Sequence, residues 1–510
     1  MTRTSLCLRQ KTLARVVLLS VTGLMFLSAA GVASSSSDEG KRDLDANGLA
    51  ILPAPADKQI AEALKRISAP ELEQNITTLV TFHNRSTISS VDTDLPQGQG
   101  VTAAANWIES RLKEYSAECG GCLEVKMDTF TEPPQTGPRP RIVRPTTITN
   151  VYAILRGSDP AQAKRMILVT GHYDSRNTDI MDSHGAAPGA NDDASGVAVS
   201  LACAHALSKL KLPATLVFAA VAGEEQGLNG SSHLARLARS EGWDLEAVLN
   251  NDIVGGNTTP GDTLQDKSAV RLFSESIPAN ATPEDQRAIL RLGYESDSPS
   301  REEARAIAGI ARTYERDLGP VKEGGKAAAD FHPVMEFRLD RFLRGGDHSS
   351  FNQQGFAAVR FTEWREDFNH QHQNVRTENG VEYGDLLKFV DFDYVARVAR
   401  LNAAALATLA AAPPPPANVK VVVKNLDNNT TLNWTDAPGA PSGTGYEVVW
   451  RELAAPDWQR FTSAGGDQLR GANGEHSITL PISKDNVIFG VRAVDAAGHR
   501  SVAVVPIPER

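Results

Sequence analysis

The sequence predicts an α/β domain, with a mostly parallel central sheet flanked by helices, followed by a small all-β sandwich. The first observation is a series of short, continuous apolar runs, which are typical of strands buried on both faces. The second is that helical patterns alternate with these runs, as in sheets of parallel strands. The third is a change after Pro413–Pro416, where the runs become short, alternating or β-branched and are separated by turn residues.

Strand and helix segments follow one another in the first domain, which we place at residues 58–411. The expected strands are Met166–Thr170, Thr215–Ala222, the run from Leu245 to Leu249, and Ala357–Phe361. The expected helices cover residues 194–210, 231–239 and 385–411. The first of these helices is apolar nearly all round, which predicts a buried position. Residues 412–417 then form a stiff, proline-rich linker, and residues 418–510 form the sandwich.

Residues 1–33 have the layout of a secretory signal peptide. Basic residues precede an apolar run from Val16 to Leu27, and small residues follow it up to Ala33. The run is shorter than the ~20 residues of a membrane-spanning helix, so we expect cleavage and no stable membrane insertion. The protein is therefore expected to be secreted or periplasmic. Residues 34–57 are rich in small and polar residues and are expected to form a flexible tether or a short pro-segment.

Charge and cysteine content narrow the possible functions. The net charge of -10 at pH 7 argues against a nucleic-acid partner, which would require a basic surface. Cys119 and Cys122 form a closely spaced pair, and no second pair accompanies them. In an exported protein this spacing favours a local disulfide that tightens a turn over a redox pair or half a zinc site.

Polar segments follow the apolar strands, where open α/β sheets bind their ligands. His172 and Asp174 end the first strand. The histidine is a candidate metal ligand, and Asp174 can accept its other imidazole N–H. Asp192 and Asp193 stand directly before the buried helix. Both acids could simply cap that helix, or one could cap it while the other bridges two metal ions.

Glu224 and Glu225 come at the end of the second apolar strand, where a solvated surface role explains two charges poorly. One carboxylate can bind metal while its neighbour faces the attacking water. Asp252 follows the third strand, and His348 lies in a glycine-hinged loop before the fourth. Nitrogen and oxygen ligands without a thiolate are typical of a hydrolytic zinc centre that keeps one position open for water.

These segments together resemble the bacterial leucyl aminopeptidase-like family of co-catalytic dizinc exopeptidases. The motifs, in the same order and rough spacing, are Gly-His-Tyr-Asp-Ser from residue 171, Pro-Gly-Ala-Asn-Asp-Asp-Ala-Ser-Gly from 188, Glu-Glu-Gln-Gly-Leu-Asn-Gly-Ser from 224, Asn-Asp-Ile from 251 and Gly-Asp-His-Ser-Ser-Phe from 346. The resemblance extends over residues from about 70 to 411. It implies an aminopeptidase that holds two Zn²⁺ ions and removes N-terminal residues, preferably apolar ones, from peptide substrates.

The resemblance also implies a metal-ligand set. Asp192 matches the carboxylate that bridges both zinc ions. His172 and Asp252 match the remaining ligands of one ion, and Glu225 and His348 match those of the other.

Further roles follow from the same resemblance. Glu224 matches the general base, and Asp174 matches the partner of the His172 imidazole. The peptide bond before Asp193 matches a position where the family often has a cis bond. His372 resembles a late histidine of the family and is a candidate for substrate binding, although a solvent-facing turn would also explain it. Tyr294, Tyr314 and His370 are further candidates for the donor that stabilises the tetrahedral intermediate.

The C-terminal module resembles a fibronectin type III domain through Trp434 and the runs 446–451 and 489–495. This implies a module for surface or polymer contact, with a spacer or stabilising cap as the alternative. For the first domain the alternatives are a carboxypeptidase or a glutaminyl cyclase on the same zinc fold. A binding protein with an inactive enzyme domain would retain fewer of these residues.

Overall fold

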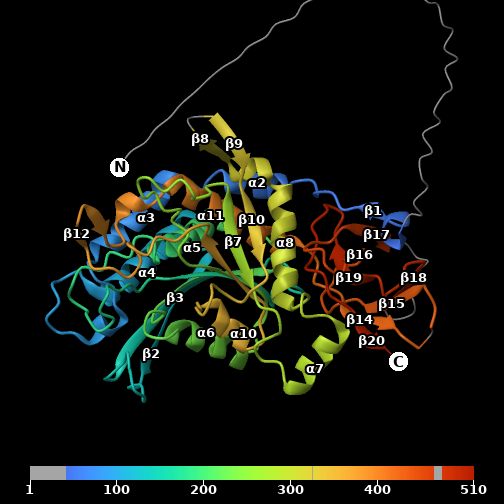
Figure 1. The fold of residues 1–510 in the computed structure, drawn as a ribbon, viewed down its shortest axis with the longest axis horizontal. Helices are drawn as coiled ribbons and strands as arrows, with labels where there is room; N and C mark the ends of the chain where they lie inside the picture. Colours follow the sequence, from blue (N-terminus) through green and yellow to red (C-terminus); the bar gives the residue numbers. More distant parts are fainter. Residues whose placement is uncertain (1–41, 324–325, 425, 465–473, 510) are drawn as a thin grey trace, which may run out of the picture. The chain divides into compact units, whose positions relative to one another are not determined.

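The central sheet of the computed structural model has eight strands (Figure 1). Their order is β10 (His332–Glu336), β7 (Ala269–Ser274), β11 (Ala358–Glu363), β6 (Asp244–Asn251), β4 (Arg165–His172), β5 (Thr215–Val221), β3 (Thr146–Leu155) and β2 (Leu123–Glu132). The structure describes residues 42–323, 326–424, 426–464 and 474–509, so the predicted signal peptide lies outside the described residues. Within those ranges no helix combines the length and apolarity that a membrane span needs.

The middle of this sheet consists of the four strands that the apolar runs predict. β11, β6, β4 and β5 are neighbours in that order, and each pair along this series is parallel. β3 and β2 add antiparallel strands at one edge, and β7 pairs antiparallel with β11 at the other. The predicted α/β fold class, with a mostly parallel central sheet, is therefore confirmed.

Helices cover both faces of the sheet, because alternate strand side chains point to opposite sides. In β4, Ile167 and Val169 pack into the larger core, whereas Met166 and Leu168 pack into a second core on the other face. α3 (Ala69–Thr81), α5 (Ala194–Leu207) and α11 (Phe392–Ala411) contribute to the larger core, and α6 (Asn229–Ser240) and α10 (His348–Gln353) contribute to the second. The predicted helix at residues 194–210 is α5, and all but one of its residues are buried.

Other elements surround this framework. They are α2 (Lys58–Leu64), η1 (Thr87–Val91), α4 (Gly100–Glu118), α7 (Pro283–Leu292), α8 (Pro299–Thr313), α9 (Glu315–Leu318), β8 (Pro320–Glu323), β9 (Lys326–Asp330), β12 (Arg376–Glu378), β13 (Val381–Tyr383) and η2 (Leu387–Phe389). The last helix begins later than predicted. Asp391 caps α11 by accepting a hydrogen bond from the Tyr394 backbone N–H, so the polar stretch from residue 385 stays outside the helix.

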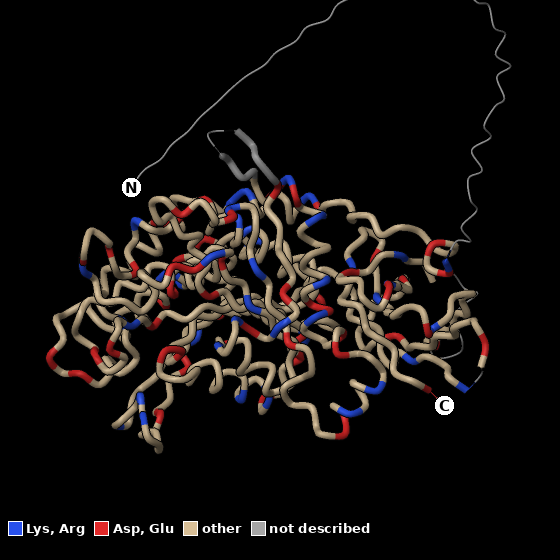
Figure 2. The backbone as a smooth tube through the Cα atoms, viewed as in Figure 1, with Lys and Arg blue, Asp and Glu red and all other residues tan. Residues whose placement is uncertain are grey.

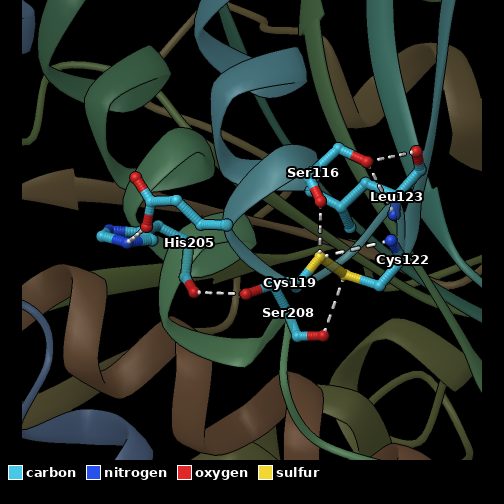
Figure 3. Close-up of a disulfide and its surroundings, with 7 residues drawn as sticks. Ser116, Cys119, Cys122, Leu123, His205 and Ser208 are labelled. Carbon is cyan, nitrogen blue, oxygen red and sulfur yellow. Dashed lines mark hydrogen bonds and ion pairs between the residues drawn. A yellow bond between two sulfur atoms is a disulfide. The ribbon is translucent and has the colours of Figure 1, made fainter.

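The predicted disulfide joins Cys119 and Cys122, where the chain turns from α4 into β2 (Figure 3). Gly120 and Gly121 both have positive φ, at 78° and 87°, a conformation that favours glycine. The Cys122 sulfur also lies 3.0 Å from the backbone oxygen of Ser208, just after α5. The disulfide therefore fixes a tight turn beside the buried helix, as the sequence predicts.

The C-terminal module consists of two four-stranded sheets, β1-β17-β16-β19 and β18-β15-β14-β20. Their strands are β1 (Leu49–Ala50), β14 (Ala417–Val422), β15 (Thr430–Thr435), β16 (Gly445–Glu452), β17 (Arg460–Ala464), β18 (Glu475–Leu480), β19 (Val487–Val494) and β20 (Ile507–Glu509). Trp434 and Trp450 are buried together in its core. Residues 34–41 of the predicted tether lie outside the described residues, and in the remainder, residues 42–57, β1 pairs antiparallel with β17. α1 (Asp43–Ala46) also belongs to this remainder.

Buried charged side chains lie where the sandwich packs on α8. Both belong to the same compact unit of the chain, which begins at Arg42. Arg451 of β16 forms an ion pair with Asp297, just before α8, and both side chains are fully buried. Arg305 of α8 lies 3.4 Å from the same carboxylate. The Trp458 indole N–H donates to Glu302, at 3.1 Å. The sandwich therefore supplies partners for charges that the first domain buries.

We expect Arg451→Met to lower the free energy of unfolding by roughly 3 kcal/mol or more, because it leaves a buried carboxylate with less compensation. Urea denaturation of both proteins measures this. Arg460→Met is the matched control, since Arg460 pairs with Asp45 in a partly exposed position, and its effect should stay below about 1 kcal/mol. Equal effects of the two variants would contradict a stabilising role for the junction.

Candidate metal centre

The polar residues gather at one edge of the sheet, because parallel strands end on the same side. His172 is the last residue of β4, Glu224 and Glu225 follow β5, and Asp252 follows β6. Asp192 lies in the turn before α5. All five are at least partly buried. The alternation of strand and helix thus brings distant segments of the chain to one place.

Two groups of side chains could each hold a metal ion, and Asp192 belongs to both. In the first group, His172 Nε2 lies 3.2 Å from Asp192 Oδ1 and 3.9 Å from Asp252 Oδ2. In the second, His372 Nε2 lies 2.9 Å from Asp192 Oδ2 and 3.0 Å from Glu225 Oε1. Ligands bound to tetrahedral zinc at about 2.0–2.1 Å lie about 3.3 Å from one another. The Asp192 carboxylate thus presents one oxygen to each group.

His348 and His372 do not lie where their predicted roles as ligand and substrate contact would place them. His348, predicted as a ligand, belongs to neither group. It is fully buried at the start of α10, where its Nε2 lies 2.9 Å from the backbone oxygen of Leu339 and 3.7 Å from Asp340. His372, predicted as a substrate contact, completes the second group instead.

Asp174 and Asp193 support the centre from outside. The Asp174 carboxylate lies 3.4 Å from His172 Nδ1, and its backbone oxygen lies 3.1 Å from the same nitrogen. The carboxylate also accepts the backbone N–H groups of Glu224 and Glu225, at 3.4 and 3.2 Å. Asp193 caps α5 by accepting the Gly196 backbone N–H, and the Asp192–Asp193 peptide bond is cis.

The electrostatics of the cluster favour a cation. Burial raises the pKa of Glu224, and the neighbouring Glu225 raises it further. Burial likewise raises the pKa of Asp347 to about 7. Burial alone would lower the pKa of His372, but the carboxylates of Glu225 and Asp192 outweigh it and raise this pKa to about 10. Closely packed carboxylates therefore create a negative potential that a bound cation would relieve.

Sequence reasoning missed two buried residues that position the ligands. Asp385, whose pKa burial raises to about 7, accepts the backbone N–H groups of Asn191 and Asp192 at 2.7–2.9 Å. Arg360 of β11 contacts the Asp252 carboxylate at 2.9 Å and Asp340 at 3.2 Å. A charge inside the otherwise apolar run Ala357–Phe361 is the signal that could have identified Arg360. The sequence around Asp385 carries no comparable signal.

A cleft of about 580 Å³ opens over both groups. It is lined by Arg141, Arg176, Asp192, Glu224, Glu225, Gly227, Leu228, Asp252, Arg341, Arg344, Gly345, Phe368, Gln371, His372 and Gln373. The other candidate donors lie elsewhere. Tyr294 donates to the backbone oxygen of Pro506, Tyr314 accepts the Asp57 backbone N–H, and His370 stacks on Phe389. Glu224 lines this cleft beside the ligand groups.

The residues present fit bound zinc. His172 Nε2 and Glu225 Oε1 are buried, and each lies 3.0–3.2 Å from another member of its own group. Both atoms therefore point toward the positions that a metal ion would take. Imidazole nitrogens and carboxylate oxygens, without a thiolate, suit a hydrolytic zinc centre.

The chain is similar to known proteins in sequence and in structure. The sequence model of "Peptidase family M28" matches residues 150–386. A "Probable zinc metalloprotease" of Pyrenophora teres is 41% identical over 464 residues, covering 90% of this chain and 89% of the relative. Another of the same description, from Pyricularia oryzae, is 42% identical over 459 residues, covering 89% and 85%. The crystal structure of the Legionella pneumophila LapA aminopeptidase aligns with 71% of this chain and 77% of its own, at 19% identity and a TM-score of 0.46.

The identity and coverage of the fungal relatives are high enough to establish the family. The matched residues 150–386 include every member of the two metal-ligand groups. The chain therefore belongs to peptidase family M28 and is a zinc metallopeptidase, a peptide hydrolase.

Proposed function

We propose that this protein is an aminopeptidase with two zinc ions, which removes N-terminal residues from peptides. The observation that carries the proposal is the position of Asp192, whose two carboxylate oxygens face different ligand groups. His172 and Asp252 complete one group, and Glu225 and His372 complete the other. In this assignment His372 takes the ligand role that the sequence motif suggests for His348.

Zinc bound in these groups would polarise a scissile carbonyl and lower the pKa of a water molecule to roughly 7. Glu224 is the general base in this proposal. Its side chain lines the cleft next to the ligand Glu225, and burial raises the pKa of this carboxyl, which makes it a stronger base. Glu224 accepts the proton of the attacking water and passes it to the leaving amine.

Residues around the proposed ligands and Glu224 hold these side chains in position. Asp174 orients the His172 imidazole and fixes the backbone that carries Glu224 and Glu225. Asp385 fixes the backbone of Asp192. Gln371 donates to Asp192 Oδ2 at 3.0 Å, so the loop that carries His372 is tied to the shared carboxylate.

Release of a chromophore from leucyl-anilide tests the function directly. The purified protein should hydrolyse this substrate, lose the activity on chelation and regain it when zinc is restored. Leucyl-anilide has a free α-amine and no carboxylate, so its cleavage distinguishes an aminopeptidase from a carboxypeptidase. Conversion of an N-terminal glutamine peptide to its cyclic product, without hydrolysis, would instead identify a glutaminyl cyclase.

Arg360→Met is expected to weaken zinc binding by roughly 10–100-fold, because it removes the cation that orients Asp252. Competition with a chromogenic chelator measures the affinity. Arg360→Lys, which keeps a positive charge in the buried site, should recover part of it. Unchanged affinity in the methionine variant would show that Asp252 needs no such support.

We further propose that the enzyme is exported, on the basis of the basic and apolar pattern of residues 1–33. The C-terminal module, which we propose to be fibronectin type III-like, acts at least as a stabilising cap through its contacts with α8. N-terminal sequencing of the protein recovered from the medium or periplasm tests the first point. A mature chain that begins close to residue 34 is the expected result.

A further inference from the structure

Arginines dominate the wall of the catalytic cleft beyond the metal-ligand groups. Arg141, Arg176, Arg341 and Arg344 all line it, whereas Phe368 and Leu228 are the large apolar side chains among the lining residues. This composition differs from the apolar preference that the family resemblance implies. An apolar residue would be held mainly by apolar side chains.

The carboxylates of the cleft do not balance these arginines once metal is bound. The acidic lining residues are Asp192, Glu224, Glu225 and Asp252. Three of them are the proposed zinc ligands, and Glu224 is the proposed base. Two divalent cations would compensate these four charges, so compensation of the arginines would depend on carboxylates outside the lining.

Arg141 has no carboxylate partner recorded in the described part of the chain. Its Nη1 donates to the backbone oxygen of Glu225 at 2.9 Å, which anchors the guanidinium at the edge of the second ligand group. The remaining guanidinium donors are free to bind a planar anion, since a guanidinium carries five N–H groups. The residue is therefore placed beside the chemistry without being neutralised there.

The carboxylate that pairs with Arg344 also pairs with two other arginines. Glu366 lies 2.7 Å from Arg341, 2.9 Å from Arg271 and 3.5 Å from Arg344, which is the longest of the three contacts. Arg344 also donates to Gln371 at 3.2 Å, and 32% of its side chain remains exposed. Arg341 has a second partner in Asp340, at 3.0 Å, but Asp340 also contacts Arg360. These two carboxylates thus face four guanidinium groups, so the charge of Arg344 is only partly compensated.

We propose that Arg141 and Arg344 bind a carboxylate of the peptide substrate and so determine specificity. Guanidinium groups bind carboxylates through paired, charge-assisted hydrogen bonds. The carboxylate comes either from an acidic side chain at the N-terminus or from the C-terminus of a short peptide. The proposal rests on the proposed aminopeptidase function and names its substrate class.

Matched substrates test the proposal on the wild-type enzyme. Glutamyl-anilide and glutaminyl-anilide have nearly the same shape and differ in charge, and the peptides Leu-Gly and Leu-Gly-amide differ only at the C-terminal carboxylate. We expect kcat/KM to be about tenfold or more higher for the charged member of one pair, since a hydrogen bond to a charged group is worth about one to two factors of ten. The first pair reports an acidic side chain, and the second reports a short peptide.

The variants Arg141→Gln and Arg344→Gln then assign the effect. Each should lower the charged-to-neutral ratio of kcat/KM in the preferred pair, and the double variant should abolish it. Arg156→Gln is the matched control, because Arg156 pairs with Glu124 in an exposed position and does not line the cleft. Circular dichroism and zinc content establish that each variant is folded and loaded with metal.

The affinity for the charged and neutral ligands can be measured without turnover. Calorimetry on the zinc-loaded Glu224→Gln protein should give tighter binding of the charged member of the preferred pair, and adding Arg141→Gln and Arg344→Gln should remove the difference. Equal binding and equal kcat/KM within both pairs would overturn the proposal. Failure to cleave leucyl-anilide or any member of the two pairs, with the charged ligand still bound more tightly, would overturn the aminopeptidase function alone.

Discussion

Glu224→Gln is expected to reduce kcat for leucyl-anilide by roughly 10²–10⁴-fold while both zinc ions stay bound. The substitution keeps the size and hydrogen-bonding capacity of the side chain but removes its ability to accept the water proton. Because Glu224 lies outside both metal-ligand groups, its loss should leave the metal affinity nearly unchanged. Steady-state kinetics and zinc content after dialysis measure the two quantities.

The expected pattern is specific to a general base. Glu73→Gln on the exposed face of α3 is the control for the same chemical change and should alter neither quantity. Retention of near-normal kcat in the Glu224 variant would rule out the assignment. Loss of zinc along with activity would make Glu224 a ligand.

His372→Ala should remove one of the two zinc ions. Loss of a residue that only contacts a metal ligand lowers activity roughly 10–100-fold, so loss of the ligand itself should lower it at least as much. The imidazole contacts Asp192 and Glu225 at 2.9 and 3.0 Å, and no other histidine belongs to that group among the described residues. Zinc stoichiometry by atomic absorption, before and after chelator treatment, gives the result.

His348→Gln provides the comparison that separates the two histidines. His348 is fully buried, and its Nε2 lies 2.9 Å from a backbone oxygen, which a glutamine amide can also reach. This variant should therefore keep two zinc ions per chain and lose mainly thermal stability. The opposite result, with zinc lost from the His348 variant and kept by the His372 variant, would restore the ligand set implied by the sequence motif.

The central strands could be predicted because their signal is local. A strand buried on both faces must be apolar along its whole length, as in β4 and β5. The elements of the segment from Asn257 to Gly346 were not predicted, because its sequence is mostly polar, and yet β7 and β10 join the sheet there. Their place depends on pairing with distant strands.

Sequence alone also determined most of the candidate site. His172, Asp192, Glu225 and Asp252 stand at the ends of predicted strands or directly before a predicted helix, and parallel strands bring such ends together. The structure brings these four residues into the two groups that could hold a metal ion, and their binding of zinc stays a prediction. The disulfide between Cys119 and Cys122 follows from short spacing, which is again a local property.

Only the tertiary structure shows which of His348 and His372 belongs to a metal-ligand group. Both lie in segments flanking β11, and the sequence pattern does not specify the paths of these segments. Loop geometry decides it: His348 begins α10 and turns into the core, whereas His372, with a positive φ of 56°, reaches Asp192. Arg360 and Asp385 owe their roles to contacts with residues more than 100 positions away. The pairing of β1 with β17 joins opposite ends of the described chain. Such contacts depend on how distant segments pack, which local sequence patterns do not encode.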